Sequence, residues 1–285
     1  MSARLRGIAR ETVEITEAGR YRLPGGRVVD IGGEVAAAVA GTRLYGPGPV
    51  DPGPPGPHGA PVVEVTGESS LQAARRMLTE AAEPVAVLDF ASARNAGGGF
   101  LNGAQAQEEA LCRSSALHAC LRTVPDFYAA HRADSSPFYS DRVIHAPAVP
   151  VFRDDRGALL EQPYPVDFLV AAAPNAGVVA ARMPDHVRMV PEALRIRAER
   201  VLETAAACGL RRLVLGAWGC GVFRNDPAQV AAAFHGHLAP GGGFGGRFGQ
   251  VVFAVLDRRP DSPVRAAFRA AFGRAAHGPE PVPFD

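Results

Sequence analysis

Two adjacent glutamates, Glu108 and Glu109, lie shortly after three consecutive glycines and open a predicted helix. A backbone without Cβ atoms can approach a ligand closely and adopt positive φ angles. A loop ahead of a helix N-terminus is also a ready anion site, because unpaired amides and the helix dipole both favour negative charge. Carboxylates beside such a loop indicate chemistry next to a phosphorylated sugar. The residues concerned are Gly97, Gly98, Gly99, Gln107, Glu108 and Glu109.

A second glycine-containing loop follows another predicted strand, within residues 216–225. Gly219 and Gly221 flank Cys220 there and form a backbone cradle suited to a diphosphate, which needs N–H donors from more than one side. An ordinary turn explains most isolated Gly-x-Gly sequences. Two such loops after two strands favour a diphosphate clamp. The sequence near Cys220 contains no candidate general base that could activate its thiol. We therefore interpret Cys220 as a small residue and not as a nucleophile.

Asn95 and Asp89 lie just before the first glycine loop. Asn95 could cap the loop through its side chain or bind a ligand. Asp89 falls inside an apolar strand and could be a buried, hydrogen-bonded structural residue, so its role is open. Successive helical side chains diverge by about 100°. We therefore expect that Glu108 and Glu109 do not both face the same bond.

The apolar periodicity predicts alternating strands and helices along most of the chain. The pattern indicates an α/β fold, a three-layer α/β/α sandwich around a mixed, mostly parallel sheet. In such sheets ligands bind at the carboxyl ends of strands, where both glycine loops lie. The predicted strands are 27–31, 61–66, 85–92, 142–152, 165–173, 212–217 and 250–257. The predicted helices are 2–17, 34–40, 69–82, 107–122, 191–208, 227–238 and 262–274, and residues 125–132 are predicted to be a short helix or a turn.

A run rich in proline and glycine, residues 46–57, cannot form helix or sheet and is predicted to be a surface loop. It divides the chain into two predicted parts. Residues 1–60 form a short N-terminal accessory segment that packs on the main domain. We expect residues 61–285 to form the main domain, which carries both glycine loops and both glutamates and is therefore the candidate catalytic domain.

The composition limits the class of protein. The chain of 285 residues is 47% hydrophobic and 21% charged, with a net charge of +1, which gives no broad basic face for sequence-specific nucleic-acid binding. All 30 basic residues are arginine, which excludes P-loop NTPases and pyridoxal-phosphate enzymes because both need a lysine. The spacing of the four cysteines and eight histidines fits no metal site. We expect no metal, no cofactor and no membrane span, and a monomer in the cytoplasm.

The motifs, taken in order, resemble the poly(ADP-ribose) glycohydrolases, which have a macrodomain fold, and they are most similar to the bacterial form of that family. The resemblance covers roughly residues 61–257 and is specific because several motifs lie in register. The motifs are Gly97–Gly99 followed by Gln107–Glu109, then Val143–Pro147, Val149–Asp155 and Gly216–Asn225.

The resemblance implies a role for each candidate residue. Glu109 is the catalytic general acid and base, and Glu108 is a supporting catalytic residue that binds ribose hydroxyls. Asn95 binds the distal ribose and Phe223 packs against it. The phosphates contact Gly219, Cys220, Gly221 and Val222. The other implied substrate-binding residues are Gly97, Gly98, Gly99, Gln107 and Asn225.

The implied activity is hydrolysis of ribose–ribose O-glycosidic bonds in poly(ADP-ribose), mainly at chain ends, with ADP-ribose as the product. The implied partners are the polymer or an ADP-ribosylated protein, and the implied setting is the reversal of ADP-ribosylation in the DNA damage response. Two alternatives use a similar fold: a mono-ADP-ribosyl hydrolase acting on protein or nucleic acid, and a non-catalytic ADP-ribose-binding macrodomain. Glu109 argues against the second, because a binding module needs no acid at that position.

Overall fold

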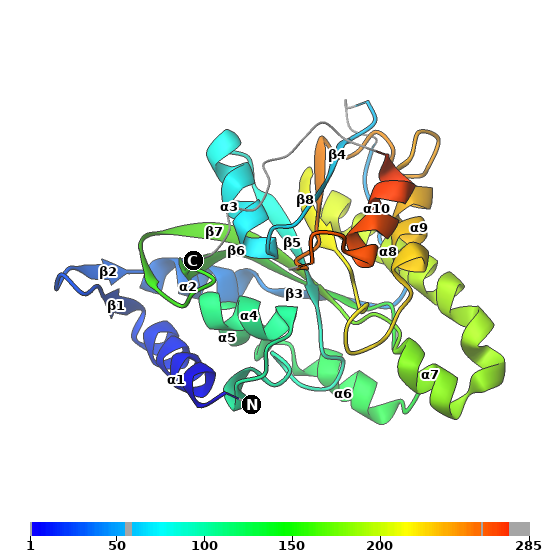
Figure 1. The fold of residues 1–285 in the computed structure, drawn as a ribbon. Coiled ribbons are helices and arrows are strands. Elements are labelled where there is room, and N and C mark those ends of the chain that lie inside the picture. The colour runs from blue at the N-terminus through cyan, green and yellow to red at the C-terminus, as the bar shows by residue number, and fades with distance from the viewer. Residues whose placement is uncertain (1, 55–58, 258, 274–285) are drawn as a thin grey trace. The chain divides into compact units, whose positions relative to one another are not determined.

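The structure is a computed structural model that describes residues 2–54, 59–257 and 259–273. These residues form two compact units, each assembled from segments that are distant in the sequence (Figure 1). Unit 1 comprises the described residues within 1–46, 89–135 and 142–171, and unit 2 comprises the described residues within 47–88, 136–141 and from Ala172 onward.

Unit 1 is built on antiparallel strands in the order β3-β6-β7, which are Arg43–Tyr45, Val143–Arg153 and Leu159–Ala171. A separate hairpin pairs β1 (Arg20–Arg22) with β2 (Val28–Asp30). The helices of unit 1 are α1 (Ala3–Ala18), α2 (Gly32–Gly41), α4 (Gln107–Ser114), α5 (Leu117–Leu121) and α6 (Pro125–Ala133), with a 3-10 turn, η1 (Phe100–Asn102).

A buried hydroxyl connects α1 to the helix that carries the glutamates. Thr12 on α1 donates its Oγ1 hydrogen to the backbone carbonyl of Arg113 at 2.8 Å and accepts a hydrogen bond from Arg153 Nε at 3.2 Å. Arg153 also forms an ion pair with Glu11 of α1. The N-terminal helix thereby braces α4 from one side.

Unit 2 is built on parallel strands in the order β5-β8-β9-β4, which are Val85–Phe90, Arg212–Gly216, Gln250–Ala254 and Val62–Thr66. The last residues of β5, Asp89 and Phe90, belong to unit 1. The helices of unit 2 are α3 (Ser70–Glu80), α7 (Ala176–Arg182), α8 (Val190–Ala207), α9 (Pro227–Leu238) and α10 (Pro263–Phe272), with a 3-10 segment, η2 (Pro184–Met189).

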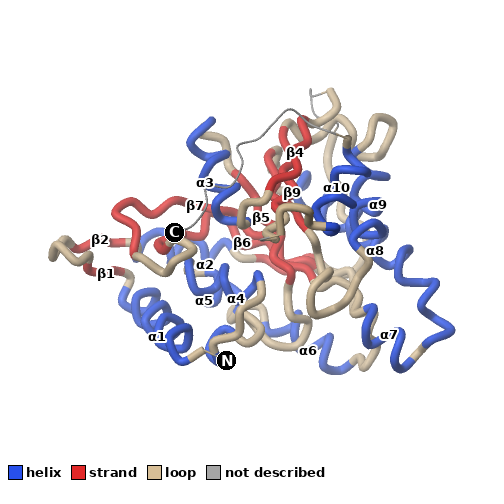
Figure 2. The backbone as a smooth tube through the Cα atoms, viewed as in Figure 1, coloured by secondary structure: helices blue, strands red, loops and turns tan. Residues whose placement is uncertain are grey.

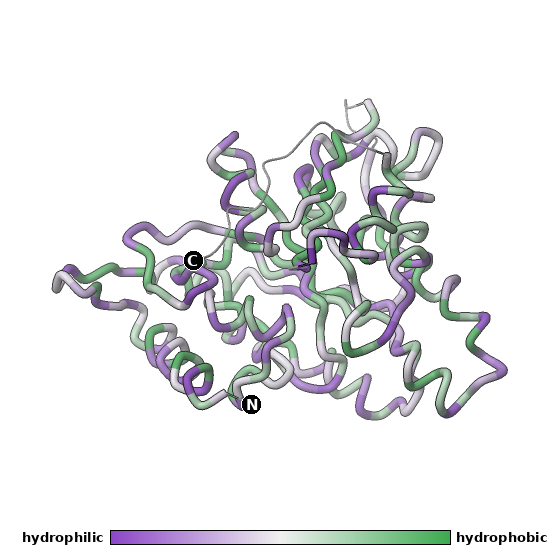
Figure 3. The backbone as a smooth tube through the Cα atoms, in the orientation of Figure 1, coloured by the Kyte–Doolittle hydropathy of each residue, from purple (hydrophilic) through white to green (hydrophobic). Residues whose placement is uncertain are grey.

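The helices of unit 2 cover both faces of its parallel strands. Helix α3 lies on one face, and α8, α9 and α10 lie on the other (Figures 1 and 2). Strand β8 is buried along its whole length, and β9 is buried after its first residue. After their first residues, Arg212 and Gln250, both strands are apolar runs without alternation (Figure 3), as expected for parallel strands covered on two faces.

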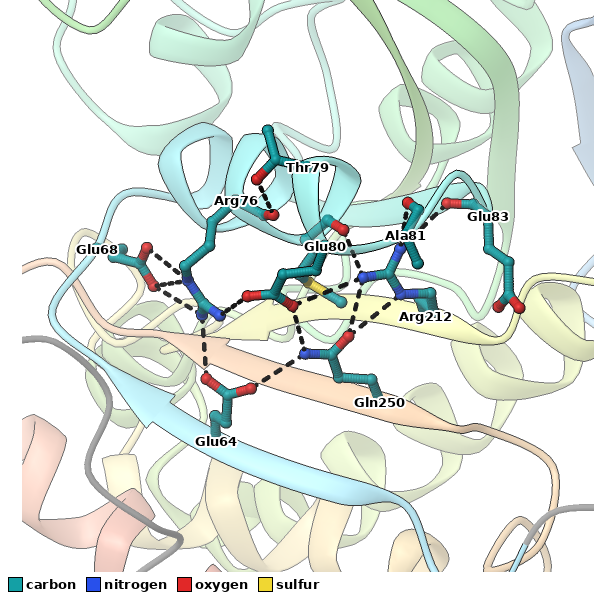
Figure 4. Close-up of polar contacts among 10 residues, drawn as sticks. Glu64, Glu68, Arg76, Thr79, Glu80, Ala81, Glu83, Arg212 and Gln250 are labelled. Atoms are coloured by element: carbon teal, nitrogen blue, oxygen red, sulfur yellow. Dashed lines mark hydrogen bonds and ion pairs between the residues drawn. The ribbon is translucent and has the colours of Figure 1, made fainter.

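Arg212, at the start of β8, holds the end of α3 against the sheet (Figure 4). Its side chain is only 6% exposed. The guanidinium donates to the carbonyls of Met77 (2.5 Å), Ala81 (3.1 Å) and Glu83 (3.3 Å). The three carbonyls lie at and just beyond the C-terminal end of α3, so the positive charge of this arginine matches the negative end of the helix dipole.

A second arginine, Arg76 on α3, is surrounded by three carboxylates. Arg76 forms ion pairs with Glu64 (3.1 Å), Glu68 (3.0 Å) and Glu80 (2.9 Å), and Gln250 donates to Glu64 (Figure 4). This network connects β4, α3 and β9. The network therefore holds α3 against the face of the parallel strands that this helix covers.

The predicted α/β fold with parallel and antiparallel strands is confirmed, and each predicted helix and strand has a counterpart. The predicted helix 107–122 is wrong in one respect, because it is two helices, α4 and α5. Ser115 between them is extended and forms an isolated bridge with Val151. The sequence also missed β1, β3, α7 and η2, and β7 begins at Leu159, earlier than predicted.

Residues 46–54 of the predicted proline- and glycine-rich loop contain no helix or strand. Residues 55–57 of that loop, and residue 274 at the end of the last predicted helix, lie outside the described residues. The division of the chain into residues 1–60 and 61–285 stays a prediction.

Candidate active site

Three consecutive side chains in the first turn of α4 each accept a hydrogen bond from a backbone amide of the segment that precedes the helix. The pairs are Gln107 Oε1 with Phe90 N (2.9 Å), Glu108 Oε2 with Ser92 N (2.8 Å) and Glu109 Oε1 with Gly99 N (2.8 Å). Since each pair fixes a side chain to the backbone at a different point, the start of α4 is locked onto the strand end and the glycine loop. Gln107 contributes to this positioning through its amide oxygen.

Gly98 lies directly against both glutamates. Its φ angle is 56°, and a Cβ atom placed there would lie 2.5 Å from Glu109 Oε1 and 2.8 Å from Glu108 Oε2. The two carboxyl groups therefore converge over one glycine. The expectation, drawn from the 100° helical spacing, that Glu108 and Glu109 do not both face the same bond stays a prediction; the two carboxyls are anchored on different backbone amides.

Each glutamate has one anchored oxygen and one that is buried with no protein partner. Glu108 is 3% exposed and Glu109 is 8% exposed. Within the described part of the chain, Glu108 Oε1 and Glu109 Oε2 have no hydrogen-bond partner. Buried polar atoms are almost always paired, so these two oxygens are the ones available to a ligand.

A third carboxyl group lies close to the glutamates. Asp89, at the end of β5, is fully buried, and neither of its oxygens has a partner among the described residues. Burial, followed by the charge of Glu109, raises the pKa of Asp89 well above its usual range. Burial, followed by the charge of Asp89, likewise raises the pKa of Glu108. Asp89 and Glu108 therefore ionise less readily than carboxyl groups in water.

Tyr128 of α6 adds a phenol to this cluster. It is 4% exposed, and its pKa is raised by burial and then by the charges of Glu108 and Asp89. The Tyr128 phenol therefore stays protonated and is an uncharged polar group beside the carboxyls. The sequence analysis missed Tyr128, because nothing in the sequence around α6 indicates that its phenol is buried within range of the charges of Glu108 and Asp89.

The glycine loop binds the protein's own carboxylate, which was not expected. We expected its amides to cradle a ligand anion, but Gly99 N donates to Glu109, and Gly98 N donates to the carbonyl of Asn95 at 3.0 Å. The loop thus acts first as a support for Glu109. Asn95 itself is exposed, and its side chain has no protein partner in the described residues, so it is free to contact a ligand.

The second predicted loop belongs to unit 2 and follows β8. Its turn is closed by hydrogen bonds from Asn225 N to Gly219 O (3.0 Å) and from Arg224 N to Gly221 O (3.1 Å), and Gly219 has a φ of 71°. Four amides of this loop donate to no acceptor among the residues that the structure describes. They are those of Gly219, Gly221, Val222 and Phe223. Unpaired amides gathered in one short turn are the donors that a diphosphate requires.

Three side chains of this loop are placed differently from one another. Asn225 is 2% exposed and lies under Gly219, and its side-chain amide is unpaired within the described residues. Val222 is 80% exposed. Burial, followed by the charge of Asp226, raises the pKa of Cys220 to about 12. The Cys220 thiol therefore stays protonated, as the sequence interpretation of a small residue requires.

The predicted residues thus form two groups. Asn95, Gly97, Gly98, Gly99, Gln107, Glu108 and Glu109 come together in unit 1, and Gly219, Cys220, Gly221, Val222, Phe223 and Asn225 come together in unit 2. Among the described residues, no group of three or more His, Cys, Asp or Glu side chains is arranged to hold a metal ion. No described helix is long and apolar enough to cross a membrane.

Comparisons with known proteins agree on one family. Residues 9–154 match the sequence model of the microbial-type PARG catalytic domain, PARG being poly(ADP-ribose) glycohydrolase. The chain is similar to the crystal structure of PARG from Thermomonospora curvata, with 53% identity over 95% of this chain and 100% of that one and a TM-score of 0.87. The same enzyme bound to the inhibitor ADP-HPD matches at 52% identity over 94% and 99% of the two chains, with a TM-score of 0.86.

PARG from Deinococcus radiodurans in complex with ADP-ribose is more distant. It has 45% identity over 86% of this chain and 99% of that one, with a TM-score of 0.77. No match was found among curated protein sequences.

Proposed function

The chain belongs to the microbial-type PARG family, glycohydrolases that act on poly(ADP-ribose), and we propose that it cleaves ribose–ribose bonds at polymer ends with Glu109 as general acid and base. The observation that carries this role is the placement of the Glu109 carboxyl. One oxygen is fixed by the Gly99 amide, and the other is buried and unpartnered.

Cleavage of a glycosidic bond passes through an oxocarbenium-like state and needs a proton for the departing oxygen. In our proposal, the protonated Oε2 of Glu109 donates that proton to the ribose oxygen as the C–O bond breaks. The resulting carboxylate stabilises the cation. It then takes a proton from water as the water oxygen bonds to the anomeric carbon, which restores the acid.

Glu108 supports this step through its free oxygen. Oε1 of Glu108 accepts a hydrogen bond from a ribose hydroxyl beside the scissile bond, while Oε2 stays on the Ser92 amide. The raised pKa values of Glu108 and Asp89 mean that these two carboxyls ionise less readily than carboxyls in water, which reduces the negative charge beside the proposed acid.

The remaining substrate-binding roles are those that the resemblance to the family implies. We propose that the unpaired amides of the Gly219–Phe223 loop bind the diphosphate and that Phe223 packs against the distal ribose, which Asn95 also contacts. Asn225 supports the loop from beneath Gly219. No cofactor is needed for this chemistry. The proposal places the protein in the cytoplasm as a monomer that removes poly(ADP-ribose) from modified proteins, including during the DNA damage response.

The test is the time course of products released from purified poly(ADP-ribose) of defined length. The proposal predicts free ADP-ribose from the first time point, with gradual shortening of the polymer. Early release of oligomers would mean internal cleavage. Cleavage of mono-ADP-ribosylated protein but not of the polymer would favour a mono-ADP-ribosyl hydrolase. Tight binding of ADP-ribose without any release would indicate a binding module.

A further inference from the structure

Tyr139, which no sequence motif singled out, adopts a backbone conformation that tyrosine rarely takes. Its φ angle is 59°, in the left-handed region that costs energy for residues with a bulky side chain. Glycine would adopt this conformation without strain. A tyrosine at such a position has to be explained by what its side chain contacts.

The ring of Tyr139 packs against Phe223. The two ring centroids are 5.9 Å apart at an interplanar angle of 46°, which is within the range of favourable aromatic pairs. Both residues are partly exposed, and both belong to unit 2. Phe223 is also held through its backbone, because its carbonyl accepts a hydrogen bond from Gly177 N at 2.9 Å. The backbone of Phe223 is thus fixed by α7, and its ring is fixed by Tyr139.

Arg197 holds the segment that carries Tyr139. This arginine of α8 is 2% exposed. It donates to the carbonyl of Phe138 at 2.7 Å and to the carboxylate of Asp141 at 2.9 Å, which lie on either side of Tyr139. It also donates to the carbonyl of Ala172 at 2.7 Å. Since charge-assisted hydrogen bonds to a buried guanidinium are strong, the clamp maintains the unusual backbone at Tyr139.

We infer that Tyr139 is a positioning residue for the nucleotide, and that it orients the Phe223 ring before the substrate arrives. Arg197 supports it from behind. The inference rests on the proposed function, because it takes Phe223 as a contact of the distal ribose. A ring that is already oriented loses less conformational freedom on binding. The pair therefore strengthens binding of ADP-ribose without touching the reacting bond.

The discriminating substitution is Tyr139→Gly, because glycine removes the ring and also suits the left-handed backbone. We expect its melting temperature to stay at or above that of the parent. The dissociation constant for ADP-ribose, measured by calorimetry, should rise about three- to tenfold. The KM for poly(ADP-ribose) should rise with it, while kcat stays within about twofold. Tyr139→Asn, which also tolerates this backbone, provides the same comparison if the glycine variant folds poorly.

Three further variants distinguish a positioning role from a general structural role. Tyr139→Phe keeps the ring and should retain the parental dissociation constant. Arg197→Lys loosens the clamp and should raise that constant, whereas Arg195→Lys, on the exposed side of the same helix, should leave it unchanged.

Unchanged binding of ADP-ribose by Tyr139→Gly, in a parent that cleaves the polymer, would overturn this inference alone. A fall in kcat without weaker binding would also overturn it. A parent that neither binds ADP-ribose nor cleaves the polymer would overturn the proposed function and this inference together.

Discussion

At the scale of single residues, Gly98 is the position where the backbone lies directly against both glutamate carboxyls. Any Cβ atom there would meet both glutamate carboxyls. The glycine run was recognisable from the sequence as a place of close backbone approach. What it approaches could not be read from the sequence, because the pairing of Gly99 N with Glu109 depends on the path of the whole loop.

Gly98→Ala should therefore displace both carboxyl groups. We expect kcat on poly(ADP-ribose) to fall by about 100-fold or more, because a small misplacement of a catalytic group has a large effect on rate. Gly7→Ala in α1 is the matched control, since nothing lies within 4 Å of the Cβ it would add, and it should keep the parental kcat. Parental turnover by Gly98→Ala would show that the carboxyls can move without loss.

Asp89 makes the stability of the folded chain depend on pH. Because burial raises its pKa in the folded state, the native protein binds more protons than the unfolded chain once the pH exceeds the ordinary value of about 4. Stability is then fully present below that pH and declines as the pH rises toward the raised pKa. One proton corresponds to about 1.4 kcal/mol per pH unit, or about 3 °C in Tm for a chain of this size.

Asp89→Asn should reduce this decline. The measurement is Tm at intervals from pH 5 to 8 for the parent, Asp89→Asn and the exposed control Asp185→Asn. We expect the Tm of the parent and of the control to fall more steeply with pH than that of Asp89→Asn. Equal slopes in all three proteins would show that Asp89 does not titrate as described.

At the scale of elements, the join between α3 and β8 depends on one buried arginine. Arg212→Met would leave the carbonyls of Met77, Ala81 and Glu83 without their charged donor. We expect the free energy of unfolding to fall by about 3 kcal/mol or more. Urea unfolding measures this directly. Arg195→Met removes an exposed arginine from surface ion pairs and should change stability little; an equal effect of both substitutions would refute the role of Arg212.

The elements themselves were largely predictable where the apolar pattern is strong. The capping box of α3, in which Ser69 and Gln72 exchange hydrogen bonds, corresponds to the predicted start at Ser69. The direction of β6 and β7 was not predictable, because β6 and the end of β7 are buried without the alternation that is typical of antiparallel strands. The break at Ser115 was not predictable either, since it coincides with a bridge to Val151, which is distant in the sequence.

At the scale of the whole molecule, the candidate site residues come from segments that the sequence keeps far apart, and each compact unit is discontinuous. Local patterns identified Glu108, Glu109 and the two glycine loops. They could not identify Asp89 as a member of the carboxyl cluster, or Tyr128 and Tyr139 as neighbours of site residues. Those three depend on packing between distant segments, for which one sequence carries no local signal.

The central claim is that Glu109 is the acid and base of glycosidic cleavage. The most direct test compares release of ADP-ribose from poly(ADP-ribose) by the parent and by Glu109→Gln, which keeps the shape of the side chain. We predict that kcat falls by at least about 100-fold and that binding of ADP-ribose changes by no more than about threefold. Release of ADP-ribose by Glu109→Gln at the parental rate would contradict the account.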